Sequence, residues 1–250
     1  MRKIIAFLAA CLALLILCVA GAEGSATYSF GSKVLAGDVD LGRPLTLMPS
    51  GTIFAFVDTG APGYGQDDGV YLHIPKSKRD ADPQVNDNDI RITPLLNSSG
   101  AMLKPAGSSV EKGDIDWQNH LTPLQGATIR YMDQYGSTGY DLGDPVYLHQ
   151  SINSNLPSEI ETINYDVRLT NVTDAQGFPV PGLAPGTKII DLDSDRNKLL
   201  GLSPSALGPI AYFDKNGDGF YDDGDEIYVN YPDGGLSVKV NNVRLTEVNT

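Results

Sequence analysis

The segment from Asp214 to Asp225 carries oxygen-bearing side chains in the order that a calcium loop uses. With Asp214 as position 1, the donors at positions 1, 3, 5, 9 and 12 are Asp214, Asn216, Asp218, Asp222 and Asp225. Gly219 at position 6 permits a sharp turn, and the carbonyl of Phe220 at position 7 is a further ligand. Because Ca²⁺ takes about six to eight oxygen ligands, this spacing predicts a calcium site. The alternative is a hairpin turn rich in Asp, Asn and Gly.

Three other acidic segments carry fewer donors, and we expect weaker calcium sites in them. Their candidate ligands are Asp133, Asp141 and Asp144; Asp58, Asp67 and Asp68; and Asp191, Asp193 and Asp195. The last set is followed by Arg196, where a calcium loop has glycine. Two further pairs, Asp38/Asp40 and Asp114/Asp116, are interpreted as solvated acidic turns.

The acidic loops recur because the chain contains an internal repeat. Each loop at 58–68, 133–144 and 214–225 lies between two apolar runs. The sequences that follow are Asp89-Ile90-Arg91-Ile92-Thr93, Asp166-Val167-Arg168-Leu169-Thr170 and Asn242-Val243-Arg244-Leu245-Thr246. These landmarks predict repeats at 31–106, 107–185 and 186–250, preceded by a short segment at 23–30.

The elements that must position the loops are β-strands. Short runs rich in β-branched and aromatic residues lie at 52–57, 70–74, 128–132, 146–148, 209–213 and 227–231. Glycine and proline separate them, and no stretch beyond residue 22 shows sustained helical periodicity. We therefore expect an all-β protein with calcium loops between strands. It is either three sandwich-like modules in a row or one composite β-structure.

The N-terminal segment and the charge indicate an exported protein. Residues 1–22 resemble a cleaved signal peptide, with Arg2 and Lys3 before an apolar run; a retained membrane anchor is the alternative. Cleavage would leave no membrane span and no cysteine in the mature chain. The net charge of −13 argues against nucleic acid and anionic lipid as partners. Asn97 and Asn171 begin glycosylation sequons, so glycan decoration is a further expectation for a secreted or surface chain.

The sequence does not predict an enzyme. His73 and His149 occupy the same position of two repeats, where the third repeat has Asn230, and a catalytic base is not expected to recur in this way. No nucleophile motif or phosphate-binding glycine loop is recognisable.

Two resemblances add to this interpretation. The loop 214–225 resembles the calcium loop of EF-hands and dockerins, although position 12 is Asp and strands are expected on both sides. The elements at 141–148 and 166–170 resemble those of repeat-bearing exported surface proteins of methanogenic archaea, including sheath- and filament-forming proteins. The second resemblance implies a structural role at the cell surface.

The chain ends suggest how such a subunit would assemble. The third Arg-Leu-Thr strand, 243–246, has no following repeat, and an unpaired strand edge recruits another chain. We therefore expect head-to-tail self-association into a homopolymer, in a filament, sheath or surface layer. The alternative is that residues 23–30 fold back and cap their own chain. The protein would then be a monomeric, calcium-stabilised adhesin or glycan- or protein-binding module.

Overall fold

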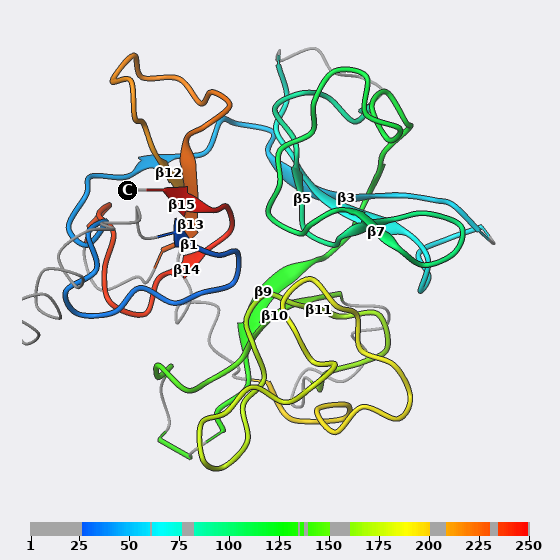
Figure 1. The fold of residues 1–250 in the computed structure, drawn as a ribbon, viewed down its shortest axis with the longest axis vertical. Helices are drawn as coiled ribbons and strands as arrows, with labels where there is room; N and C mark the ends of the chain where they lie inside the picture. The colour runs from blue at the N-terminus through cyan, green and yellow to red at the C-terminus, as the bar shows by residue number, and fades with distance from the viewer. Residues whose placement is uncertain are drawn as a thin grey trace, which may run out of the picture.

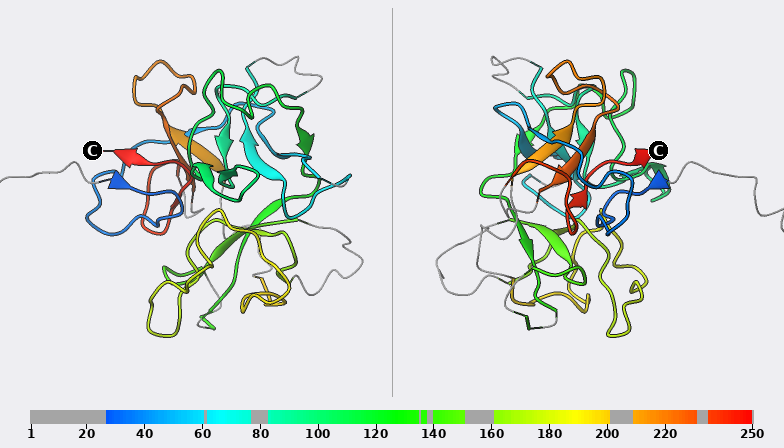
Figure 2. Two further views of the ribbon diagram at one scale, coloured as in Figure 1. Left: turned by 45° about the vertical axis from the view of Figure 1, so that its right-hand side comes forward. Right: turned by 90° about the vertical axis from the view of Figure 1, so that its left-hand side faces the viewer.

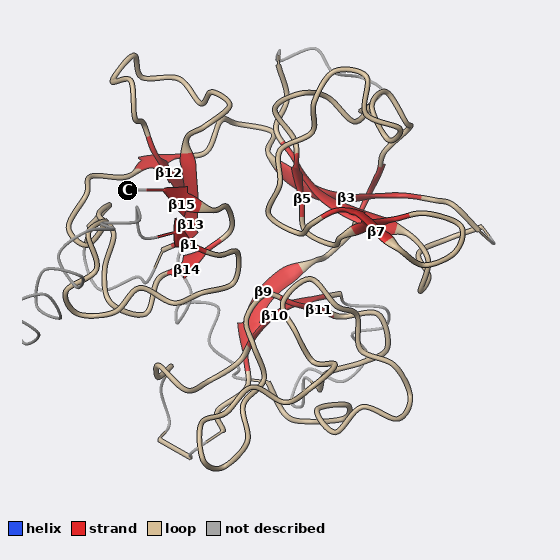
Figure 3. Cartoon of the chain, in the orientation of Figure 1, coloured by secondary structure: helices blue, strands red, loops and turns tan. Residues whose placement is uncertain are grey.

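The computed structural model describes residues 27–60, 62–76, 83–134, 136–137, 140–150, 161–200, 209–230 and 235–249. The described residues form short strands and no helix, which confirms the all-β class, and loops join the strands (Figure 3). The strands are β1 (Thr27–Tyr28), β2 (Thr46–Leu47), β3 (Ile53–Val57), β4 (Gly69–His73), β5 (Ile90–Arg91), β6 (Leu95–Leu96), β7 (Met102–Lys104), β8 (Thr122–Pro123), β9 (Thr128–Tyr131), β10 (Val146–His149), β11 (Val167–Arg168), β12 (Ile210–Phe213), β13 (Glu226–Val229), β14 (Val243–Arg244) and β15 (Val248–Asn249).

Three small antiparallel sheets define three lobes around a common centre (Figure 1). The first lobe (residues 49–123) contains the sheet β5-β4-β3-β8, and the second lobe (124–200) contains β11-β10-β9. The third lobe contains β14-β13-β12-β2, so it combines residues 27–48 with residues 209–249. Two further strand pairs, β6-β7 and β1-β15, lie beside these sheets. In each lobe the hairpin strands flank one of the acidic loops.

The middle strand of each sheet is buried on both faces. In β10, Val146 and Leu148 point into a core that all three lobes share, whereas Tyr147 points into a core of the second lobe alone. The same alternation occurs in β4 and β13, because successive side chains of a strand point to opposite faces. The lobes are therefore parts of one composite structure and not separate sandwiches.

The first and last described segments of the chain meet in the third lobe. Strand β1 pairs with β15, and β2 pairs with β12 (Figure 2). Lys33 also bridges to Val243, so the edge of β14 is covered by the N-terminal part of the same chain. The expectation of an unpaired edge at 243–246 is wrong, and the alternative, that the N-terminal segment caps its own chain, holds for its described residues.

Three glycines with positive φ allow the lobes to approach one another at the centre. A Cβ added to Gly107 (φ +81°) would lie 2.6 Å from the Cβ of Phe30. Equivalent close approaches join Gly31 to Pro185 and Gly186 to Ala106. Each contact links two lobes, so the three together close the ring of lobes.

Candidate cation-binding loops

The loop 214–225 gathers four polar side chains at the surface. The carboxylate of Asp214 accepts hydrogen bonds from the backbone N–H groups of Gly217 and Gly219, at 2.6 and 2.7 Å. The side-chain amide of Asn216 donates to Asp218 at 3.2 Å and to Asp222 at 3.0 Å. The side chains at positions 3, 5 and 9 of the predicted calcium loop are thus in contact, and the side chain at position 1 binds the backbone of the same loop.

The carboxylates of this loop raise the pKa values of buried neighbours. Burial is the main cause of the raised pKa of Asp225, and the charges of Asp214 and Asp222 add to it. Burial also raises the pKa of Tyr212, and four loop carboxylates contribute. A bound cation would relieve this repulsion. Within the described part of the chain, however, no three His, Cys, Asp or Glu side chains are grouped closely enough to hold a metal ion. Calcium binding therefore stays a prediction.

The aspartates that end the three loops have a structural role that the sequence did not predict. Asp68, Asp144 and Asp225 are buried, and each closes its loop by accepting two backbone hydrogen bonds. The donors are the N–H groups of Thr59 and Gly65 for Asp68, Gln134 and Asp141 for Asp144, and Lys215 and Asp222 for Asp225. These carboxylates shape the loops whether or not an ion is bound.

The other aspartates of the two weaker loops lie nearer the surface. Asp58 accepts a hydrogen bond from Gly63 N–H, and Asp133 accepts one from Gly136 N–H. Asp67 and Asp141 are exposed. Among the described contacts, neither of these two loops joins its acidic side chains to one another as the third loop does. Both instead receive a lysine from another lobe, a contact that the sequence analysis missed.

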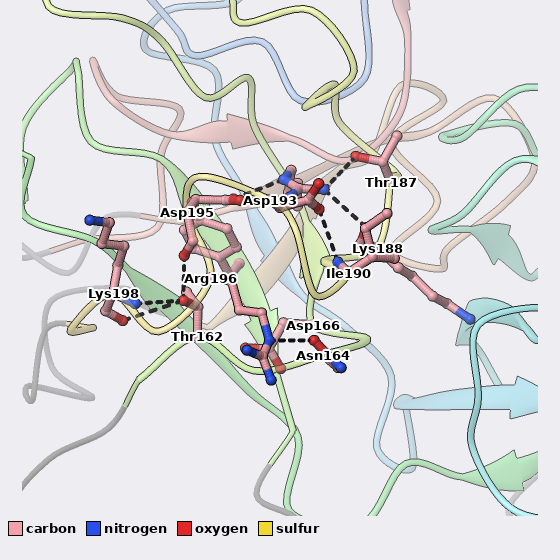
Figure 4. Close-up of polar contacts among 12 residues, drawn as sticks. Thr162, Asn164, Asp166, Thr187, Lys188, Ile190, Asp193, Asp195, Arg196 and Lys198 are labelled. Carbon is pink, nitrogen blue, oxygen red and sulfur yellow. Dashed lines mark hydrogen bonds and ion pairs between the residues drawn. The ribbon is translucent and has the colours of Figure 1, made fainter.

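The acidic segment 191–195 binds an arginine. Arg168 donates from Nε and Nη2 to the two oxygens of Asp195, at 2.9 and 2.7 Å, and from Nη2 to Asp193 at 2.6 Å. Both aspartates are labelled in Figure 4. Asp191 forms an exposed ion pair with Arg196. Because Asp193 and Asp195 are committed to a buried guanidinium, the expected calcium site at 191–195 is corrected to an arginine clamp.

The same clamp occurs in the other two lobes. Arg91 binds Asp114 and Asp116, and Arg244 binds Asp38 and Asp40, with the same guanidinium nitrogens. The three arginines are fully buried, and Asp40 and Asp116 are buried as well. The interpretation of these aspartate pairs as solvated turns is therefore wrong. A tyrosine hydroxyl also donates to the inner aspartate of each clamp, the donors being Tyr71, Tyr147 and Tyr228.

The clamps join segments that the predicted repeat boundaries separate. Arg91 lies in 31–106 and its aspartates in 107–185, while Arg168 likewise contacts the next segment. Arg244 binds Asp38 and Asp40 from the N-terminal part of the chain, more than two hundred residues away in sequence. Burial would raise the pKa of Asp114, but backbone N–H of Glu111 and the charges of Arg91 and Lys104 lower it to about 2.

One histidine in each of the first two lobes is held in a buried pair. His73 Nδ1 lies 3.0 Å from Asp89, and His149 Nδ1 lies 2.8 Å from Asp166. The third lobe replaces both partners at once: the Asn242 side-chain amide donates to Asn230 Oδ1 at 3.2 Å. This joint replacement fits a packing role for the pair.

Asn97 and Asn171 are both exposed, and Asn97 lies in the turn between β6 and β7.

Among the described residues, no helix has the length and apolar character needed to cross a bilayer. Comparisons with protein-family models, with curated proteins and with solved structures found no match to this chain.

Proposed function

We propose that this protein is an exported, calcium-stabilised module that works as one closed chain at the cell surface. Its role is that of an adhesin or of a module that binds glycan or protein. The observation that carries the proposal is the pairing of β1 with β15, together with the clamp of Arg244 by Asp38 and Asp40. A chain that completes its own third lobe needs no second copy to cover that strand edge.

The same observation removes the main argument for a head-to-tail filament. Assembly through this edge would need β14 to lack a partner, whereas Arg244 N–H donates to Ser32 O and Gly31 N–H donates to Arg244 O. Self-association through another surface would need an argument of its own, and we therefore favour the monomeric alternative.

Calcium is proposed to bind the loop 214–225. Asp214, Asn216, Asp218 and Asp222 lie on one exposed loop. The charges of Asp214 and Asp222 raise the pKa of Asp225, and a divalent cation would neutralise this carboxylate repulsion. The weaker loops at 58–68 and 133–144 are not part of the proposal, because lysines already supply a positive charge there.

The test is the effect of calcium on thermal unfolding. Extracellular calcium sites commonly have dissociation constants of about 0.1–1 mM, so 10 mM Ca²⁺ should raise the melting temperature by about 3–10 °C relative to chelator. The double substitution Asp214→Ala and Asp218→Ala should remove most of this rise. Glu111→Ala with Glu247→Ala removes two exposed charges elsewhere and should preserve it.

Light scattering on the same samples measures the particle mass. The parent should be monomeric with and without calcium. A calcium response that survives the loop substitutions would contradict the assigned site, and long particles in calcium would contradict the monomeric role.

A further inference from the structure

Two of the three loops bind a cation that the chain itself supplies. Lys33 Nζ donates to the backbone carbonyls of Asp141 and Leu142, at 2.9 and 2.8 Å, and also to that of Asp144. Lys188 Nζ does the same in the first loop, with the carbonyls of Gly65, Gln66 and Asp68. We call each set of three carbonyls a cradle.

Each cradle is built for a positive charge. An ammonium has three N–H donors and a neutral amine only two, so three carbonyl contacts use every donor of the charged form. Below each ammonium lies an aromatic ring: Lys33 Nζ is 4.4 Å from the centroid of Tyr140, and Lys188 Nζ is 4.6 Å from that of Tyr64. Burial lowers the pKa of Lys33 to about 7, which the charges of Asp144 and Asp141 oppose.

The third loop has the backbone of a cradle. The backbone N–H of Asp222 donates to the carboxylate of Asp225 at 3.0 Å, as that of Asp141 donates to Asp144 at 2.8 Å. In both loops the last N–H also donates to the first carbonyl at 3.1 Å. The aromatic ring is present too, since Tyr221 packs on Tyr212 at 5.5 Å between centroids, as Tyr140 packs on Tyr131 at 5.4 Å.

The lysine is missing from the third copy of this arrangement. Lys33 forms a backbone β-bridge with Val243, and Lys188 forms one with Val167. In the equivalent position of the remaining lobe, Ile90 forms this β-bridge with Ser109. Its carbonyl accepts a hydrogen bond from Arg91, as the Lys188 carbonyl does from Arg168. A serine side chain is uncharged, ends at Oγ and is too short to reach a cradle.

The glycine contacts at the centre indicate which lobe faces this cradle, because Gly107, two residues before Ser109, lies against Phe30 of the third lobe. Burial raises the pKa of Tyr221, with a contribution from the charge of Asp89, next to Ile90. Burial raises the pKa of Tyr64 in the first loop, with a contribution from Asp166, next to Val167. The segment that carries Ser109 therefore faces the third loop in the same way as the segment that carries Lys188 faces the first loop.

No lysine at the position of Ser109 balances the negative charge around the third cradle. Asp222, Asp223 and Asp225 place three carboxylates within four residues, whereas 141–144 has two and a lysine beside them. We propose that the carbonyls of Asp222, Asp223 and Asp225 bind a monovalent cation of about the size of ammonium, such as potassium, against the ring of Tyr221. Carbonyl oxygens are the ligands that potassium prefers. This site uses the backbone, goes beyond the proposed function and is independent of calcium.

The experiment measures the melting temperature in chelator at constant ionic strength, with choline chloride replaced by potassium, ammonium or sodium chloride. Choline is too large for the cradle. Potassium or ammonium should raise the melting temperature of the parent by about 2–5 °C over choline. In Ser109→Lys the tethered ammonium should raise the melting temperature in choline and abolish the response to potassium. Ser109→Met, of similar length but uncharged, should give no gain in choline.

A reciprocal variant keeps the test valid if Ser109→Lys does not fold. Lys33→Ser empties a second cradle, so its response to potassium should exceed that of the parent. Equal melting temperatures in choline and potassium for the parent would overturn the proposal, as would a potassium response unchanged in Ser109→Lys. An effect reproduced by millimolar calcium in the Asp214→Ala, Asp218→Ala variant would overturn the assignment to a monovalent ion. Loss of the calcium response alone leaves these outcomes unaffected.

Discussion

At the residue scale, three buried arginines each hold two aspartates in the described part of the protein. Arg91, Arg168 and Arg244 are among the largest fully buried side chains, and each guanidinium contacts two carboxylates. A buried ion pair adds little net stability compared with a well-packed apolar pair, but removing one partner leaves an uncompensated charge in the interior.

Arg168→Met should therefore destabilise the protein by about 3–5 kcal/mol, because Asp195 would remain buried without its partner. Arg196→Met is the control: it removes an ion pair with the exposed Asp191 and a hydrogen bond to Asn164, but leaves no buried charge, so it should cost about 1–2 kcal/mol. The free energy of unfolding from urea denaturation measures both. A cost near 1 kcal/mol for Arg168→Met would show that the clamp is not a structural anchor.

The sequence identified the acidic residues but assigned several of them to the wrong partner. Asp214, Asn216, Asp218 and Asp222 do share one loop, because their spacing is local. Asp193 and Asp195 were misassigned because their partner, Arg168, lies more than twenty residues away, and local spacing carries no information about it. The joint change of the His–Asp pairs to Asn230 and Asn242 was a usable signal that these positions are in contact.

At the element scale, the hairpin strands could be predicted because their apolar runs are continuous. Strands such as β10 are buried on both faces and read as unbroken apolar sequence. The two-residue strands β1 and β2 could not be predicted, because they are exposed or half-exposed and pair with strands at the other end of the chain. These strands decide whether the third lobe closes.

The glycines at the centre provide a test of how the elements meet. Gly107→Ala would place a methyl group 2.6 Å from Phe30, in addition to the strain of an alanine at positive φ. Gly113→Ala is the matched control, since its φ is +98° but a Cβ there meets nothing within 4 Å. Gly107→Ala should cost about 1–3 kcal/mol more in unfolding free energy than Gly113→Ala. Equal costs would mean that the lobes do not pack tightly at this point.

At the scale of the whole molecule, the protein is a ring of three lobes that share one core. Thr27 and Asn249 are 222 residues apart in sequence and lie opposite each other in an antiparallel pair, with their side chains in contact. The ring is therefore closed by the first and last described strands of one chain, and the proposal of a self-contained module depends on this closure.

The most direct test of this closure is a disulfide between Thr27→Cys and Asn249→Cys. Both cysteines of the chain, Cys11 and Cys18, lie in the predicted signal peptide, so the mature variant has only the introduced pair. Opposite residues of antiparallel strands are close enough for a disulfide. On oxidation, the variant should form an intramolecular disulfide and stay monomeric on non-reducing gels at every protein concentration, while each single cysteine variant keeps a free thiol. Disulfide-linked dimers and longer ladders that increase with concentration would show that the ends pair between chains, and would contradict the closed ring.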